Sequence, residues 1–385
     1  MLRAFKTELH PTPEQCSKIA QTIGVCRFLY NRFLAMNFER HQAGKPFMSG
    51  YDFDKYVNHE LSKTLPWIKQ TCGSKARKKA IMNAQNAFNR FFHGHSRRPR
   101  LKKKQRQETG AYFPKNNKGD LLVERHRIKI PTLGWTRLKE YGYIPTNAKV
   151  VSCTLTKKAD RYYISVLVEV EETSIDVQPN GLGIGVDLGI KGFAFTSEGK
   201  TFRNINQSST VKQCERRLKR AQRALSRKYE AKKRGEKPAT EGGSNIRKNI
   251  LRVQKLHQRL ANKRKAYRAW VVSQLVKTKP ASITIEHLNV RGMMRNRHLA
   301  KAIAAQGFYD FKQKLIQACQ KRKIQLREVA LFYPSSKLCS CCGAKKVTLS
   351  LSERIFHCDH CGYEGDRDVN AAMNLAQARE YAVLT

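Results

Sequence analysis

Two Cys-x-x-Cys-Gly motifs near the C-terminal end constrain the fold of this chain more than any other feature. They occupy residues 339–343 and 358–362, and fifteen residues separate Cys342 from Cys358. This spacing is typical of a four-cysteine zinc ribbon, in which two tight turns and a connecting hairpin bring four thiolates to one ion. The thiolates expected to bind a structural Zn²⁺ are those of Cys339, Cys342, Cys358 and Cys361.

The other cysteines and two nearby histidines offer alternatives to this ligand set. Cys342 and Cys361 each precede a glycine, which favours them over Cys341 and over sets that use His357 or His360. The seven remaining cysteines lack the spacing of a disulfide framework. Their odd number and the absence of a signal-peptide pattern favour a reducing, intracellular setting. No apolar run approaches the roughly 18 residues of a membrane span, so we expect no membrane partner.

The chain is strongly basic along its whole length. Its 385 residues include 75 Lys and Arg against 30 Asp and Glu, a formal net charge of +45. Repulsion at this level opposes compaction unless a polyanion offsets it, which excludes an ordinary small-molecule enzyme and predicts a nucleic-acid partner. A merely solvated basic surface or a membrane-surface binder is disfavoured, because the charge is not confined to one tail.

Periodicity divides the chain into helical and strand-rich segments. Apolar residues recur at helical spacing in 14–40 and 74–92, with Pro13 near the first start and Ser74 as a candidate N-cap. Short strand-like runs lie at 2–9 and between 110 and 171, which predicts a small antiparallel barrel or sheet interrupted by the helices. Further strands are predicted at 184–187, 193–196, 201–203, 283–286 and 324–329, with helices at 305–322 and 369–376.

Two segments concentrate positive charge. Residues 96–106 hold seven cations around Pro99, which makes a poor helix and a good phosphate-contacting loop. Residues 211–278 form a predicted helical hairpin with a break at 235–243. Within it, residues 211–268 contain 21 Lys and Arg but only 4 Asp and Glu. The predicted nucleic-acid contacts are Arg97, Arg98, Arg100, Lys102, Lys103, Lys104, Arg216, Arg217, Lys219, Arg220, Arg223, Arg247, Lys248, Arg252, Arg259, Lys263 and Arg264.

Three acidic residues stand beside apolar strands or at a helix start. Asp187 ends the strand 184–187, Glu286 ends the strand 283–286, and Asp368 opens the last predicted helix. Burying such carboxylates is costly unless a cation is present. If the three converge, they would bind two divalent ions, and Mg²⁺ is expected because it prefers hard oxygen ligands.

Neighbouring residues leave some roles open. Asp366 competes with Asp368, since one of them could cap the helix while the other binds metal; Asp368 is favoured because it lies two residues before Asn370. Gly185 and Gly189 are expected to let a nucleic-acid backbone approach the strand. His287 should point away from Glu286 and receives no catalytic role.

The combination of these motifs resembles a known family. Gly-Val-Asp-Leu-Gly-Ile at 185–190, Ile-Glu-His-Leu-Asn-Val at 285–290 and Asp-Arg-Asp-Val-Asn-Ala-Ala at 366–372, the last following the ribbon, are similar to motifs of TnpB proteins. These proteins are encoded by bacterial insertion sequences and are ancestors of the type V CRISPR effector nucleases. The resemblance covers essentially the whole chain and is most specific over 182–376.

The resemblance implies a multidomain α/β fold. An RNase H-like (RuvC) nuclease domain would span 182–331 and 366–385, interrupted by the zinc ribbon at 332–365. A wedge-type β-barrel at 1–12 and 110–178 would carry an inserted helical recognition domain at 13–109. Asp187, Glu286 and Asp368 would match the catalytic acids of the family.

The resemblance also implies an RNA-guided DNA endonuclease. Such a protein binds a guide RNA from the transposon end, reads a short motif beside a double-stranded target, and cleaves DNA paired to the guide. We expect a monomer in the ribonucleoprotein, in the bacterial cytoplasm and associated with the nucleoid. Asn83 and Gln85 are candidates for reading base edges.

Other functions stay open on the sequence. An RNA-guided binding protein without nuclease activity is disfavoured because all three acids are present. A transposase that performs strand transfer could use the same metal site. A ribosomal or RNA-processing zinc-ribbon protein is disfavoured, because it would not need the three acids Asp187, Glu286 and Asp368.

Overall fold

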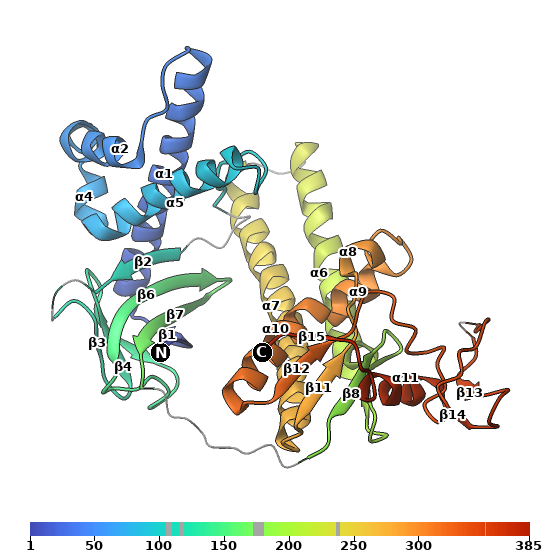
Figure 1. The fold of residues 1–385 in the computed structure, drawn as a ribbon. Helices are drawn as coiled ribbons and strands as arrows, with labels where there is room; N and C mark the ends of the chain where they lie inside the picture. The colour runs from blue at the N-terminus through green and yellow to red at the C-terminus, as the bar shows by residue number, and fades with distance from the viewer. Residues whose placement is uncertain (105–109, 116, 118, 172–180, 236–238, 351) are drawn as a thin grey trace. The chain divides into compact units, whose positions relative to one another are not determined.

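The computed structural model describes residues 1–104, 110–115, 117, 119–171, 181–235, 239–350 and 352–385 (Figure 1). The chain divides into two compact units, Met1–Glu172 and Thr173–Thr385. Each unit contains its own large sheet and its own hydrophobic core. Arg106 of the predicted basic loop 96–106 and residues 172–180 lie outside the described residues.

The first unit contains a seven-stranded antiparallel sheet. Its order is β2-β6-β7-β1-β5-β4-β3, and the strands are β1 (Leu2–His10), β2 (Gly110–Pro114), β3 (Leu122–Val123), β4 (Arg127–Ile130), β5 (Gly134–Leu138), β6 (Lys149–Lys158) and β7 (Arg161–Glu169). The predicted antiparallel sheet is thus confirmed. No ladder among the described residues joins the outer strands β2 and β3, so its closure into a barrel stays a prediction.

Helices connect β1 to β2 in this unit. They are α1 (Pro13–Gln42), α2 (Gly50–Tyr56), a π-helical turn at Val57–Leu61, α3 (Ser62–Thr64), α4 (Trp67–Thr71) and α5 (Ser74–Phe92). Helix α1 begins with a capping box: the Thr12 hydroxyl accepts from the Gln15 backbone N–H at 3.3 Å, and the Gln15 side chain accepts from Thr12 N–H at 3.1 Å.

Both predicted helices of this unit are confirmed, with two corrections. The N-cap position of α5 is Gly73, and no side chain caps the helix, so Ser74 lies inside it. Phe91, one of the apolar residues at helical spacing in 74–92, is 37% exposed and lies outside the core. Helices and sheet share one hydrophobic core, which includes Phe33 of α1, Ile81 of α5 and Ile164 of β7. The separate boundaries proposed for a barrel and a helical domain stay predictions.

The second unit contains a mixed six-stranded sheet. Its order is β10-β9-β8-β11-β12-β15, and the strands are β8 (Ile184–Leu188), β9 (Gly192–Thr196), β10 (Thr201–Arg203), β11 (Ser282–Ile285), β12 (Gln325–Glu328) and β15 (Ala382–Val383). Strands β8, β11 and β12 are parallel, whereas β9, β10 and β15 run antiparallel to their neighbours. The carboxyl ends of the three parallel strands therefore meet at one edge.

The helices of the second unit include a long basic pair. They are a 3₁₀ turn at Ile205–Gln207, α6 (Ser209–Lys233), α7 (Ala239–Lys277), α8 (Val290–Met293), α9 (Ala300–Gln306), α10 (Phe308–Arg322) and α11 (Arg367–Ala376). Leu218 of α6 packs with Leu260 of α7, which confirms the predicted hairpin. Its break is shorter than predicted, because α7 already begins at Ala239.

A second correction concerns the helix predicted at 305–322. Gly307 adopts a left-handed backbone conformation with φ of +67°, which ends α9 and starts α10 in a new direction.

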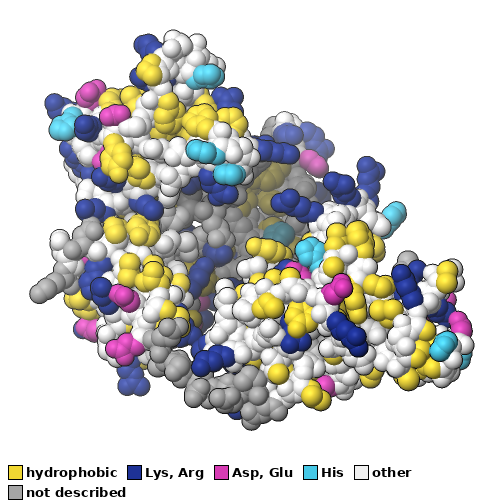
Figure 2. All heavy atoms as spheres, viewed as in Figure 1, with side chains coloured by type: hydrophobic (Ala, Val, Ile, Leu, Met, Phe, Trp, Pro, Cys, Tyr) yellow, Lys and Arg dark blue, Asp and Glu magenta, His cyan; other side chains and the backbone are white. Residues whose placement is uncertain are grey.

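None of the helices in the described part of the chain has the length and apolar character needed to cross a membrane. Figure 2 shows Lys and Arg side chains distributed over the visible surface.

Candidate active site and metal sites

Strands β8 and β11 place Asp187 and Glu286 beside each other. Val186 pairs with Ile285 in this parallel ladder, so the two acids are the next residues along adjacent strands. Val186 and Ile184 pack with α7 and α10 in the core. Because side chains alternate along a strand, Gly185 and Asp187 face the opposite side of the sheet, where α11 lies.

Gly185 admits helix α11 to that side of the sheet. An added Cβ would lie 1.9 Å from the Ala372 carbonyl oxygen and 2.5 Å from the Ala376 nitrogen. The expectation that Gly185 leaves room for nucleic acid is therefore wrong, because the protein's own helix fills the space. Gly189 likewise faces its own turn, where a Cβ would lie 3.2 Å from the Gly192 carbonyl oxygen.

Helix α11 also separates the roles of Asp366 and Asp368. The Asp366 carboxylate accepts from the backbone N–H groups of Asp368 at 2.9 Å and Val369 at 3.0 Å, which makes Asp366 the N-cap. The helix thus begins at Arg367, before the predicted start. Asp368 lies in the first turn, and its carboxylate oxygens lie 3.4 Å from Nη2 of Arg367 and 3.9 Å from Nη1 of Arg354.

The three acids affect one another electrostatically. Burial raises the pKa of Asp187 well above its ordinary value, and a hydrogen bond with Glu286 and the negative charges of Glu286 and Asp368 raise it further, whereas Arg367 lowers it. The structure therefore brings together Asp187, Glu286 and Asp368 from three distant segments. His287 lies apart from this interaction, with its Nδ1 3.3 Å from an oxygen of the buried Glu328.

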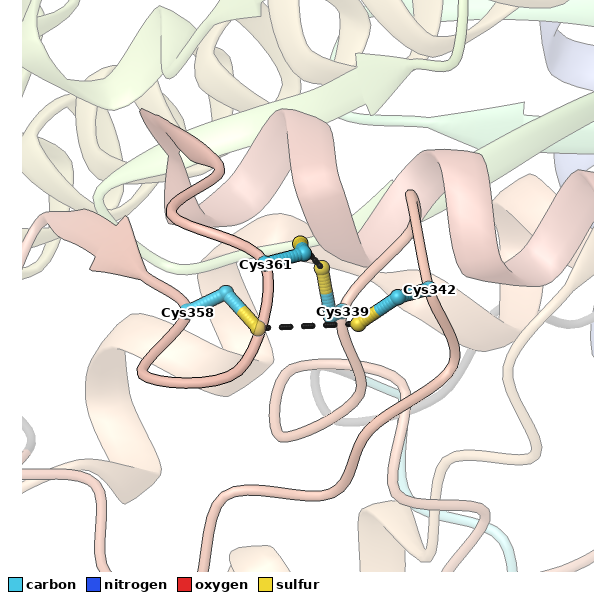
Figure 3. Close-up of side chains that lie close together, drawn as sticks. All are labelled: Cys339, Cys342, Cys358 and Cys361. Atoms are coloured by element: carbon cyan, nitrogen blue, oxygen red, sulfur yellow. Dashed lines mark hydrogen bonds between the residues drawn. The ribbon is translucent and has the colours of Figure 1, made fainter.

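The four predicted zinc-binding cysteines also converge (Figure 3). Their Sγ atoms lie within 4.8 Å of one another, with separations of 3.6 Å for Cys339–Cys361 and 3.7 Å for Cys342–Cys358. Sulfurs at tetrahedral positions about 2.3 Å from a zinc ion would be roughly 3.8 Å apart, so the cluster fits Zn²⁺. Cys341 is exposed and lies outside the cluster.

The local backbone makes this arrangement possible. Gly343 and Gly362 have φ of +76° and +72°, a left-handed conformation that lets the chain turn after each knuckle. The second knuckle joins β13 (Ile355–His357) to β14 (Glu364–Asp366) in an antiparallel hairpin. Backbone hydrogen bonds from Cys361 and His360 lower the pKa of Cys358 to about 6, whereas burial and the neighbouring thiols raise the pKa of Cys361 to about 12.

Two buried asparagines connect the first knuckle to helix α11. Asn370 donates to the Leu338 carbonyl at 2.7 Å and accepts from the Ser340 N–H at 2.9 Å. Asn374 donates to the carbonyls of Leu338 at 2.7 Å and Ser335 at 2.8 Å. We assigned no role to this pair from the sequence, although two polar residues at i and i+4 on an otherwise apolar helix face are the signal of such a connection.

A cleft between α6 and α7 gathers part of the predicted basic surface. It encloses about 660 Å³ and is lined by Arg217, Arg220, Lys248, Arg252 and Lys255 with Leu251 and Leu256. Arg264 differs from these cations: its guanidinium lies 2.7 Å from a Glu215 oxygen and 2.7 Å from the Asn206 side-chain oxygen. Arg264 therefore holds protein elements together.

The basic loop of the first unit is attached to α1. Asn31 donates to the Lys102 carbonyl at 3.0 Å and accepts from the Lys102 N–H at 2.8 Å, and Lys102 Nζ lies 3.8 Å from the Tyr30 ring centre. Burial lowers the pKa of Lys102. Arg98 similarly lies over the Phe38 ring at 4.1 Å.

The base-reading candidate Gln85 accepts from the Gly50 N–H at 2.7 Å, whereas Asn83 is exposed.

Three family models match this chain. They are described as a helix-turn-helix domain (residues 1–46), a probable transposase (165–297) and a Cas12f1-like TNB domain (308–375). Together they cover more than half of the chain. Within residues 1–46 the structure has one strand and one long helix, β1 and α1.

Individual relatives match over nearly the full length. InsQ of Escherichia coli, named for a predicted RNA-guided DNA endonuclease activity, is 29% identical over 98% of this chain and 92% of its own. A protein of Streptomyces pristinaespiralis with the same type of name is 28% identical over 98% and 89%. Cas12f1, solved with sgRNA and target DNA, has the same fold, with a TM-score of 0.60 at 12% identity over 99% of both chains.

The motifs, the cysteine cluster and these matches agree with one another. This chain is similar to the TnpB family along nearly its whole length.

Proposed function

We propose that the protein is an RNA-guided DNA endonuclease that cleaves target DNA paired to a guide RNA. One observation carries this proposal: Asp187 of β8, Glu286 directly after β11 and Asp368 of α11 are far apart in the sequence, yet burial and the charges of the other two acids raise the pKa of Asp187 well above its ordinary value. A buried carboxylate whose pKa is perturbed by neighbouring acids is typical of a catalytic site. The names of the relatives supply the RNA-guided activity.

The topology of the second unit supports a RuvC-like nuclease core. Strands β8, β9 and β10 form an antiparallel meander, and β11 and β12 extend it in parallel on the other side of β8. This arrangement is compatible with the RNase H-type core that the family resemblance implies. Asp187 lies one residue before the end of β8 and Glu286 directly after β11, at the edge where open α/β sheets bind their ligands.

The donor chemistry fits divalent metal ions. Asp187, Glu286 and Asp368 would hold them through carboxylate oxygens, for which Mg²⁺ is the expected ion. Bound there, two such ions supply an activated water and stabilise the leaving oxygen of a phosphodiester.

Arginines beside the acids would limit the repulsion between the site and its substrate. Arg354 and Arg367 both lie near the Asp368 carboxylate. The cations of the α6–α7 cleft and the exposed members of the loop 96–104 would contact phosphates of guide RNA or target DNA. A structural Zn²⁺ in the four-cysteine cluster would stabilise the knuckles.

A reconstituted cleavage assay tests this function. The chain is purified with its co-expressed RNA and offered duplex DNA that matches the 3′ end of that RNA, with Mg²⁺ or with EDTA. We expect Mg²⁺-dependent cutting that Asp187→Ala abolishes while RNA and DNA binding persist. Glu198→Ala is a control, because this acid lies in the β9–β10 turn away from the paired ends of β8 and β11.

The same assay distinguishes the alternatives. Tight binding without cutting by the wild type would support a nuclease-inactive binding protein. Covalent joining of a supplied 3′-OH end to the target would support strand transfer. If no RNA co-purifies with the active chain, the guide mechanism fails.

A further inference from the structure

Phe332 combines two unusual properties. Its side chain is 88% exposed, and its backbone is left-handed, with φ of +70°. Five non-glycine residues in the described ranges have positive φ, and Phe332 is the only aromatic one. A bulky side chain in this conformation costs conformational free energy, and glycine or asparagine would satisfy the same turn more easily.

The turn that carries Phe332 lies at the edge of the sheet where the acids gather. Glu328 ends β12 and pairs with Ile285, and the Val329 N–H donates to the Ile285 carbonyl at 3.1 Å. Val329 is thus the neighbour of Glu286 across the ladder. Phe332 follows three residues later, a length of chain that spans at most about 10 Å.

Neighbouring residues hold this turn in place. The Tyr333 N–H donates to the Ala330 carbonyl at 3.1 Å, and the Ser335 N–H donates to the Tyr333 carbonyl at 2.8 Å. The Tyr333 hydroxyl donates to the Asn374 carbonyl of α11 at 3.3 Å. The strained conformation is therefore fixed between β12 and the helix that carries Asp368, the situation in which backbone strain marks a functional position.

We propose that Phe332 stacks on an unpaired nucleobase of the strand whose phosphodiester lies at Asp187, Glu286 and Asp368. The proposal rests on the proposed nuclease function and adds a binding contact to it. Stacking on an aromatic ring accepts any base, which suits a site whose target sequence is chosen elsewhere by pairing. A ring carried by this fixed turn would orient the nucleotides next to the cut.

Cleavage kinetics provide the first test. In the RNA-bound protein, Phe332→Gly removes the ring but suits the left-handed backbone, so we expect a melting temperature no lower than that of the wild type and kcat/KM lowered roughly 5- to 100-fold. Phe332→Trp should stay within about twofold of the wild type. Tyr309→Ala, which removes a 70% exposed ring on α10, should have no effect. Cutting by Phe332→Gly at the wild-type rate would overturn the proposal.

Fluorescence provides a test that does not depend on cutting. The RNA-bound Phe332→Trp protein is titrated in EDTA with a 20-nucleotide oligo-dT strand and with an abasic strand of equal length. We expect quenching beyond that of the wild type only with the strand that has bases. Equal quenching by both strands would refute stacking even if guided cutting occurs. Conversely, failure of guided cutting in the wild type would refute the nuclease function and leave the quenching result intact.

Self-association is the remaining explanation for an exposed ring. Light scattering over a range of protein concentrations distinguishes it. A dimer of the wild type that Phe332→Gly dissociates would assign the ring to a second copy of the chain and overturn stacking on bases.

Discussion

At the scale of single residues, Asp187 is the buried acid of the candidate site, and its surroundings oppose its ionisation. Burial and two neighbouring acids raise its pKa, so its ionised form opposes folding when no divalent ion is bound. In EDTA, the wild type should lose stability as pH rises from the ordinary pKa of aspartate through the raised value, because the unfolded chain gives up this proton more readily.

Asp187→Asn should therefore stabilise the metal-free protein while it abolishes cutting. At pH 8 in EDTA we expect a gain of about 0.5–2 kcal/mol, with a melting temperature about 2–4 °C higher per kcal/mol. Addition of Mg²⁺ should stabilise the wild type but not the variant. Thermal unfolding with and without Mg²⁺ measures both effects. A variant less stable than the wild type in EDTA would contradict the assigned repulsion.

Asp366 and Asp368 form a matched pair for a second prediction. Asparagine is a good N-cap, so Asp366→Asn should keep the cap on α11, with cutting near the wild-type rate. Asp368→Asn removes a proposed metal ligand and should abolish cutting with little loss of stability. Cleavage rates and melting temperatures of the two variants check this assignment. Loss of cutting in both variants would show that the carboxylate charge of Asp366 is also needed.

The three acids could be predicted from the sequence more readily than the residues that contact them. A carboxylate at the end of an apolar strand is visible in a sequence, so Asp187 and Glu286 could be predicted at neighbouring strand ends. The choice between Asp366 and Asp368 depended on which one accepts the free N–H groups of α11. The roles of Gly185 and Arg264 depended on partners distant in the sequence, Ala372 and Glu215, which periodicity does not reveal.

At the scale of elements, the position of α11 depends on the missing side chain of Gly185. Gly185→Ala would place a Cβ against the Ala372 carbonyl, so α11 must move and carry Asp368 with it. We expect destabilisation of about 1–3 kcal/mol and a large loss of cutting. Gly24→Ala is the control: it has open space around its Cα within α1 and should be neutral or stabilising. Normal cutting by Gly185→Ala would show that α11 can shift without loss of the site.

The zinc knuckle should support the same helix from a different face. Cys358→Ser should lower zinc content and loosen the backbone that binds Asn370 and Asn374, and so reduce cutting indirectly. Asn370→Ala should reduce cutting while zinc stays bound, since it removes only the connection. Cys341→Ser, at an exposed cysteine outside the cluster, should change neither. Metal content and cleavage rate are the measurements, and full cutting by Cys358→Ser would refute the connection.

Elements with strong periodicity were predicted well, and their ends were not. The helical spacing of apolar residues in α1 and the alternation of buried and exposed residues in β7 follow directly from burial on one face. The break at Gly307 was missed because apolar spacing continues across it, and only its left-handed backbone separates α9 from α10. Strand β5 was missed because residue type does not follow burial there: the apolar Trp135 is exposed, whereas the polar Thr136 is buried.

At the scale of the whole molecule, the β-rich N-terminal half and the nuclease-like C-terminal half could be predicted. The strand-like runs of 110–171 end before residue 180, and a new set of strands begins at 184. Their internal organisation could not. Helices 13–92 and the first sheet share one core, which separate domain boundaries did not anticipate. Side chains from α1 and β7 meet there across more than a hundred residues of sequence, and such contacts leave no local pattern.

The net charge of +45 leads to the last prediction. Binding of the co-purified RNA should weaken steeply with salt, since each phosphate contact releases counterions and contributes about 0.7–0.9 to the slope of log affinity against log salt. Arg217→Ala and Arg252→Ala, in the α6–α7 cleft, should each lower the slope by about one such contact. Arg264→Gln should instead lower the melting temperature and keep the slope, because Arg264 is paired with Glu215. A flat salt dependence, or equal slopes for Arg217→Ala and the wild type, would mean that the cleft does not contact RNA phosphates and that the excess charge serves another surface.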